Sequence, residues 1–114
     1  MKIAIVGSRG ISEINIGDYV STDDEIVSGG AAGVDRCAAE YAKKNGIKLV
    51  EFLPQYELYG RAAPIKRNQE IVDYADKVIA FWDGASRGTL SVIKYAKKVG
   101  KECYTVICNM PPFQ

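Results

Sequence analysis

Ile26-Val-Ser-Gly-Gly-Ala-Ala-Gly-Val-Asp35 is the stretch that decides the fold of this chain. Its first residues favour a strand, Gly29 and Gly30 permit positive φ and the close approach of a ligand, and a helical pattern begins at Gly33. Unpaired backbone N–H groups and the positive end of a helix dipole make such a junction suitable for an anion. The stretch therefore predicts a strand, a phosphate-sized loop and the start of a helix.

The same order of strand, glycines and helix occurs twice more, at Ile3-Ala-Ile-Val-Gly-Ser-Arg-Gly10 and at Val78-Ile-Ala-Phe-Trp-Asp-Gly-Ala-Ser-Arg-Gly-Thr89. A single glycine-rich loop is weak evidence for a ligand, because glycines also permit tight packing of a helix on a sheet. Three such junctions in one chain favour a shared site at one edge of the sheet.

The composition indicates one small domain that is not expected to bind strongly charged partners. The chain has 114 residues, of which 47% are hydrophobic, and 15 basic against 14 acidic residues give a net charge of +1. With no run of like charges, neither nucleic acid nor a membrane is an expected partner. No apolar run has the length of a signal-peptide core or a membrane span, so we expect a cytoplasmic protein.

The residue types also restrict the chemistry. The chain has no histidine, which excludes Ser-His-Asp and Cys-His catalysis and zinc sites with imidazole ligands. Cys37, Cys103 and Cys108 form no CxxC pair and are odd in number, so we expect reduced, mostly buried thiols. No metal site is predicted.

Apolar periodicity predicts five strands alternating with helices. The strands are expected at 2–6, 25–28, 48–53, 77–82 and 102–107, and the helices at 33–45, 64–75 and from the 83–88 loop to 99. We expect the helix stripes to bury Val34, Cys37, Ala38, Tyr41 and Ala42, then Ile71, Val72 and Ala75, and finally Val92, Tyr95, Ala96 and Val99. Residues 11–24 are expected to hold at most a short helix, residues 54–63 a long loop, and residues 109–114 a tail, since two prolines there remove ladder donors.

This alternation is typical of a single α/β domain over residues 1–108, a Rossmann-like three-layer fold whose parallel sheet has the order 3-2-1-4-5. In that order the winding reverses between the first and fourth strands. Ligands bind such sheets in the crevice at this switch point. The 7–10 and 83–89 loops should flank it, with the 29–35 loop beside them.

Several polar residues near this crevice each allow a structural and a functional interpretation. Asp35 lies in a first helical turn, where it stabilises the helix dipole or binds a ribose hydroxyl or a basic partner. Asn68 lies on the apolar face of its helix, where it either satisfies a loop carbonyl or reaches the ligand. Ser86 caps a helix start, leaving Gly88 and Thr89 N–H groups available to a phosphate.

Arginines and aromatic rings offer further ligand contacts. Arg9, Arg67 and Arg87 lie at strand ends or helix starts, where a guanidinium can bind phosphate oxygens in a bidentate way or form a surface salt bridge. Trp82 and Tyr59 can stack on a base, although a tryptophan that ends a buried strand is more often a core residue.

Four segments together resemble a known family. Gly7-Ser-Arg9, Val27-Ser-Gly-Gly-Ala-Ala-Gly-Val-Asp35, Gly60-Arg-Ala-Ala-Pro-Ile-Lys-Arg-Asn68 and Phe81-Trp-Asp-Gly-Ala-Ser-Arg-Gly-Thr89 are similar to the signature of the YspA-like branch of the SLOG superfamily. That superfamily includes the DNA-processing protein Smf/DprA and the cytokinin-activating LOG phosphoribohydrolases. The resemblance implies a Rossmann-like domain that binds a nucleotide or nucleotide-derived ligand, and a homodimer.

Together, the loops and the resemblance predict one set of ligand-binding residues. They are Gly7, Ser8, Arg9, Gly29, Gly30, Ala31, Gly33, Asp35, Arg67, Asn68, Asp83, Gly84, Ser86, Gly88 and Thr89. The expected partner is a small phosphorylated ligand, a nucleotide or an ADP-ribose-like molecule, and no other cofactor is expected.

The expected function is binding, as a sensor or carrier. LOG-type enzymes pair an arginine with a glutamate just after a Gly-Gly-x-Gly-Thr loop, whereas Leu90-Ser-Val92 follows Thr89 here, so that carboxylate is missing. One alternative is a LOG-type phosphoribohydrolase or N-glycosidic hydrolase in which Asp35 or Asp83 positions water. A second is DprA-like binding of single-stranded DNA, which a near-neutral chain would perform only weakly and with strong salt sensitivity.

Overall fold

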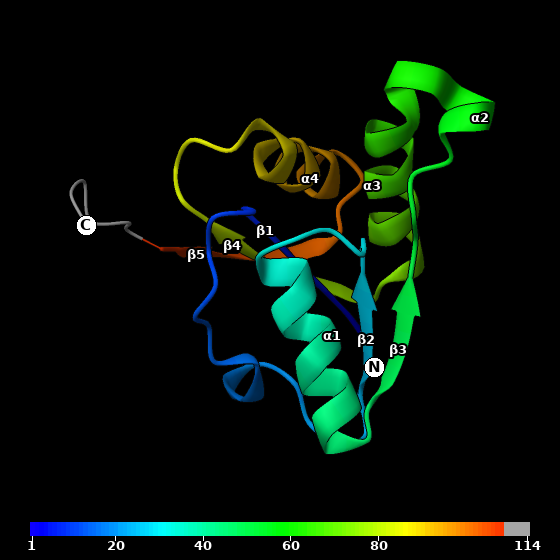
Figure 1. Ribbon diagram of the computed structural model, residues 1–114. Helices are drawn as coiled ribbons and strands as arrows, with labels where there is room; N and C mark the ends of the chain where they lie inside the picture. Colours follow the sequence, from blue (N-terminus) through cyan, green and yellow to red (C-terminus); the bar gives the residue numbers. More distant parts are fainter. Residues whose placement is uncertain (109–114) are drawn as a thin grey trace.

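A parallel five-stranded sheet organises the computed structural model, which describes residues 1–108 (Figure 1). Its order is β3-β2-β1-β4-β5, with β1 (Lys2–Gly7), β2 (Glu25–Ser28), β3 (Lys48–Glu51), β4 (Lys77–Trp82) and β5 (Glu102–Ile107). The helices are α1 (Val34–Asn45), α2 (Tyr56–Tyr59), α3 (Ala63–Tyr74) and α4 (Arg87–Lys98), with 3-10 turns η1 (Ile16–Asp18) and η2 (Gly60–Ala62). The predicted Rossmann-like fold and strand order are confirmed.

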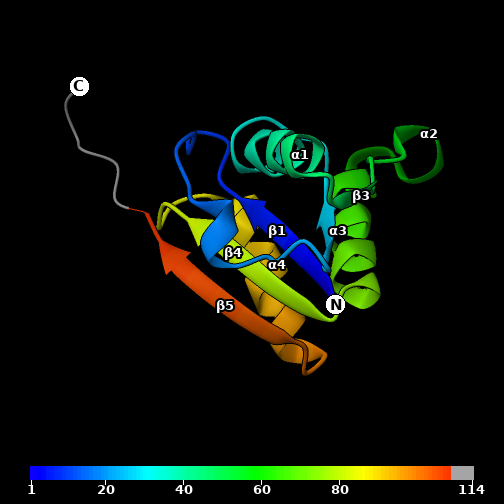
Figure 2. The ribbon, with the colours of Figure 1, turned by 90° about the horizontal axis from the view of Figure 1, so that it is seen from below.

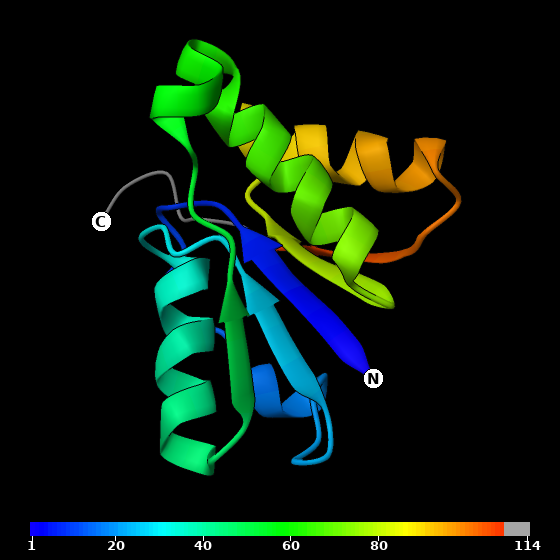
Figure 3. The same ribbon diagram turned by 90° about the vertical axis from the view of Figure 1, so that its right-hand side faces the viewer.

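The helices form two layers on opposite faces of the sheet, α1 on one and α3 with α4 on the other (Figures 2 and 3). Successive side chains of β1 point to opposite faces of the sheet, so this strand packs against both helix layers. Ile3 and Ile5 belong to the apolar cluster that α1 covers, whereas Ala4 and Val6 belong to the cluster under α3 and α4. Because both faces of β1 are buried, its sequence is an unbroken apolar run.

The β3–α3 connection differs from the sequence prediction. β3 ends at Glu51 instead of residue 53, because its neighbour β2 ends at Ser28, the residue opposite Glu51. The predicted 54–63 loop contains α2 and η2, and α3 begins at Ala63. Leu53 is 62% exposed, so its apolar side chain does not belong to a buried strand.

Some side chains that the sequence pattern predicts to be buried are partly exposed in the structure. Cys37 and Tyr41 of α1 are only partly buried, and so are the other two cysteines, Cys103 and Cys108. Asp35, by contrast, is buried. On α4, Ile93 is buried and Val99 is 45% exposed, because Val99 lies past the last helical residue. Tyr95 is half-buried, and the expected tail at 109–114 lies outside the described residues.

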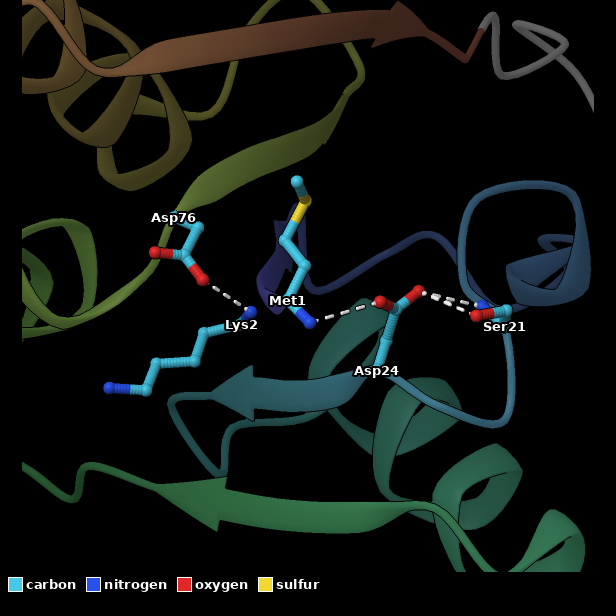
Figure 4. Close-up of polar contacts among 5 residues, drawn as sticks. All are labelled: Met1, Lys2, Ser21, Asp24 and Asp76. Carbon is cyan, nitrogen blue, oxygen red and sulfur yellow. Dashed lines mark hydrogen bonds and ion pairs between the residues drawn. The ribbon is translucent and has the colours of Figure 1, made fainter.

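Hydrogen bonds and an ion pair fasten the amino-terminal end of the sheet (Figure 4). The Met1 amine lies 3.3 Å from the Asp24 carboxylate, which also accepts bonds from the Ser21 N–H and hydroxyl at 2.8 and 3.1 Å. The Lys2 N–H donates to Asp76 at 2.7 Å. These contacts fix the start of β1, while the glycine loops lie at the opposite end of the strands.

Within residues 1–108, every helix is too short or too polar to cross a bilayer.

Candidate functional site

A pocket of about 450 Å³ lies at the carboxyl ends of β1 and β4, where the strand order reverses. The loops after β1, β2 and β4 surround it together with the first turns of α3 and α4. Its lining consists of Val6, Gly7, Ser8, Arg9, Gly10, Gly29, Ala31, Asp35, Pro64, Arg67, Asn68, Ile71, Asp83, Ser86, Gly88, Thr89 and Val92. The volume lies within the roughly 300–1,000 Å³ of small-molecule sites.

Most of the residues expected at the site share this pocket, but Gly30, Gly33 and Gly84 are outside its lining. The apolar contributions of Val6, Pro64, Ile71 and Val92, and that of Gly10, were missed. The sequence pattern assigned Ile71 of α3 and Val92 of α4 to the core. On each helix, the apolar stripe that packs in the core also forms part of the pocket wall.

Three further candidates also lie outside the lining. Arg87 is exposed, and Tyr59 is 38% exposed on α2. Trp82 packs against the cluster under α3 and α4, and its indole N–H donates to the Ser86 carbonyl at 3.0 Å. This geometry favours the core interpretation of Trp82.

Gly7 lets the first loop pass close to its neighbours. A Cβ at this position would lie 2.5 Å from both the Phe81 carbonyl oxygen and the Val34 side chain. The next residue, Ser8, donates its backbone N–H to the same Phe81 oxygen at 3.0 Å. This glycine therefore brings the β1 loop against α1 and β4 and forms one side of the pocket.

The Asp83 carboxylate organises the loop before α4. Its Oδ1 accepts the N–H groups of Ala85 and Ser86 at 2.9 and 2.8 Å, and the Asp83 N–H donates to the Ser8 hydroxyl at 3.3 Å. These bonds, first that from Ala85, hold the pKa of Asp83 below its usual value. An ionised carboxylate already bound to two donors is a poor general base, so the geometry favours a structural role for Asp83.

The amino end of α4 presents hydrogen-bond donors to the pocket. Ser86 caps the helix by accepting the Thr89 N–H at 3.4 Å, so the prediction that this N–H remains available to a phosphate is wrong. Within the part of the chain that the structure describes, the N–H groups of Arg87 and Gly88 donate to no other residue, as expected in a first helical turn. A Cβ at Gly88 would meet nothing within 4 Å, so the pocket is open there.

Arg67 joins the α3 wall of the pocket to the loop after β2. Its Nη1 donates to the Gly29 carbonyl at 2.6 Å, and its Nε donates to Asn68 Oδ1 at 3.0 Å. Asn68 thus holds Arg67 while lining the pocket, and the loop carbonyl is bound by the arginine instead. Within residues 1–108, no carboxylate lies within 4 Å of Arg67 or Arg9.

Asp35 is buried, with 7% of its surface exposed, and accepts the Ala31 N–H at 3.1 Å. Burial is the main cause that raises the pKa of its carboxyl, and the nearby Glu51 charge adds to the rise. The Ala31 bond and the Arg67 charge oppose it. The carboxylate therefore sits in a pocket wall that disfavours its ionised form.

Asp35→Asn is expected to raise the free energy of unfolding at neutral pH by about 0.5–2 kcal/mol. Because the folded-state pKa is raised, the stability contributed by protonated Asp35 is complete below its ordinary value of 3.8 and is lost as pH rises through the folded-state value. The gain should therefore vanish in acid. Urea unfolding across pH measures it, with the exposed Asp23→Asn as control; a gain that does not depend on pH would contradict this account.

Comparison with known families is consistent with this geometry. Residues 17–59 match the family described as YspA, cpYpsA-related SLOG family. This match supports the resemblance to the YspA-like branch of the SLOG superfamily that the sequence predicted. The matched segment contains Gly29, Ala31 and Asp35 of the pocket, whereas Arg9, Arg67 and the α4 start lie outside it. No curated protein matched the chain by sequence.

Proposed function

We propose that the pocket binds a nucleotide or a nucleotide-derived phosphate ligand and that the protein serves as its sensor or carrier. The observation that carries this proposal is that two arginines line the pocket and neither forms an ion pair with a carboxylate in residues 1–108. Arg9 and Arg67 have no carboxylate within 4 Å in residues 1–108, and both line the pocket that the α4 amino end enters. The match of residues 17–59 to a SLOG family also supports a nucleotide-related ligand.

The two ends of the pocket suit different parts of such a ligand. Unpaired N–H groups at Gly88 and the α4 dipole favour a phosphate. Asp35 would repel a phosphate when ionised, but it can accept a hydrogen bond from a hydroxyl. We therefore assign the phosphate to the α4 end and a ribose hydroxyl to the Asp35 end.

The alternative is hydrolysis of an N-glycosidic bond. Asp35 supports it, because a buried carboxyl with a raised pKa is suited to proton transfer. Asp83 does not, because loop N–H groups hold its carboxylate. Chromatography that detects release of free base from a nucleoside monophosphate would support the alternative and contradict a binding-only role.

A thermal-shift screen tests ligand binding directly. The purified protein is heated with nucleoside monophosphates, dinucleotides and ADP-ribose, and with single-stranded DNA as a comparison. A ligand at a hundred times its Kd stabilises the fold by ~2.7 kcal/mol, which corresponds to a shift of roughly ten degrees for a domain near this size. A screen with no shift would contradict the proposed ligand class, and a shift with DNA alone would favour DprA-like binding.

Arg9→Ala and Gly88→Val are expected to weaken binding of the selected nucleotide by roughly tenfold or more without unfolding the domain. The first removes a charge-assisted contact, and the second places a branched side chain in the open space beside the α4 donors. Isothermal titration measures both affinities, and circular dichroism checks folding. Unchanged affinity in both variants would remove the proposed site.

A further inference from the structure

The basic residues of this chain are unevenly distributed. Five of the 15 lie between Arg87 and Lys101, a segment that contains none of the 14 acidic residues. The rest of the chain therefore carries ten basic residues against 14 acidic ones. The net charge of +1 hides this difference, so the composition alone does not reveal that α4 is strongly basic.

The cations of α4 lie on one continuous face of the helix. α4 packs on the sheet and on α3 (Figure 3). The residues that it buries share the side of the helix toward the sheet; they are Thr89, Val92, Ile93 and Ala96. With about 3.6 residues per turn, the opposite side carries a row that we call the α4 stripe, consisting of Arg87, Ser91, Lys94 and Lys98. Its three cationic side chains are all exposed.

No acidic side chain neutralises the α4 stripe in the part of the chain that the structure describes. Among residues 1–108, no carboxylate lies within 4 Å of a cation of α4. α1 offers a contrast at the same spacing, because Glu40 lies between Arg36 and Lys43 on its exposed face. The corresponding position of α4 is Ser91. The α4 stripe therefore presents its full positive charge to the surroundings.

The stability of the helix does not account for all of these charges. Arg87 lies in the first turn of α4, where the positive end of the helix dipole disfavours a cation. Lys94 lies in the middle of the helix, where the dipole has little effect. Lys98 is different, because a cation in the last turn stabilises the dipole. Arg87 and Lys94 are thus the residues of the stripe that point to an anionic partner outside the domain.

Charge complementarity favours a short acidic segment over other anionic partners. The stripe is about 16 Å long, which five or so extended residues span. Nucleic acid would continue beyond it onto a domain whose other residues are mainly acidic, and the stripe has no aromatic side chain on which bases stack. A membrane surface selects apolar residues beside basic ones, whereas the apolar side of α4 is buried on the sheet. We propose that the α4 stripe docks an acidic segment of a partner protein.

Fluorescence anisotropy of the full chain with a labelled peptide of about six glutamates tests the proposal, and it needs no ligand in the pocket. The wild-type protein should bind this peptide at low salt, and the Kd should rise as salt screens the charges. Arg87→Glu combined with Lys94→Glu should raise the Kd by roughly tenfold or more, because two attractive charges become repulsive. Both side chains are exposed, and a glutamate in the first turn favours the helix dipole, so the fold should persist, which circular dichroism verifies.

Arg36→Glu combined with Lys43→Glu is the matched control. It makes the same change in net charge at the same spacing, on exposed positions of α1 across the sheet (Figure 2). It should leave the Kd nearly unchanged. Equal losses in the two variants would show that only net charge matters and would overturn the proposal, as would a wild-type protein that does not bind the peptide. Tighter binding of a single-stranded oligothymidine with the same number of charges would assign the stripe to nucleic acid and would overturn it as well.

Discussion

Replacing Arg67 with alanine is expected to weaken binding of a nucleoside monophosphate by roughly 10- to 100-fold. Hydrogen bonds that involve a charged group contribute about 1.5–3 kcal/mol, and this guanidinium lines the pocket with no carboxylate within 4 Å in residues 1–108. The change also removes its bond to the Gly29 carbonyl, so the loop after β2 loses a contact to α3. Isothermal titration at two salt concentrations measures the loss.

Arg36→Ala is the control for this change, because Arg36 is exposed on α1 and does not line the pocket. It should leave the affinity unchanged. Arg67→Lys should recover only part of the binding, since an ammonium keeps the charge but cannot reproduce the two-pronged geometry of guanidinium. Equal affinities for the alanine variant and the wild type would show that the ligand does not contact Arg67.

Gly33→Ala is expected to lower the free energy of unfolding by about 3 kcal/mol or more. Gly33 precedes α1 with φ 73° and ψ −122°, a conformation that residues with a side chain rarely adopt. A Cβ there would also overlap the Arg9 backbone, which cannot swing aside as a flexible side chain can. The added methyl therefore forces the loops after β1 and β2 apart. Urea unfolding measures the cost.

Gly46→Ala separates the two causes. Gly46 ends α1 with φ 66°, yet a Cβ there would meet nothing within 4 Å. Its replacement should cost only about 1 kcal/mol, the penalty of the left-handed conformation alone. Equal losses at the two glycines would mean that the contact between Gly33 and Arg9 contributes nothing to stability.

The layered fold was predictable because its signals are local. Apolar runs bounded by glycines marked all five strands, and their alternation with helical stripes left a parallel sheet with right-handed crossovers as the expected arrangement. The strand order then placed the loops after β1 and β4 at the switch point, where the pocket lies. The β3–α3 connection was not predictable, because exposed Leu53 has the same apolar character as a strand residue.

The chemistry of the site needed the tertiary structure. Arg67 binds the carbonyl of Gly29, a residue 38 positions away, and no periodicity in the sequence reports that contact. Asp35 had two open interpretations in the sequence; burial and the neighbouring Glu51 then determined that its pKa rises. Asp83 looked equally suited to catalysis until the structure placed its carboxylate on two loop N–H groups.

The sequence by itself thus determined the sheet, its order and the position of the glycine loops, because strand and helix patterns depend on neighbours along the chain. The tertiary structure alone decided which arginines form no ion pair within residues 1–108, which aspartate is buried and which apolar side chains, such as Leu53 and Leu58, remain exposed. Burial and charge depend on neighbours in space, and the crossover connections bring those neighbours together from distant parts of the chain.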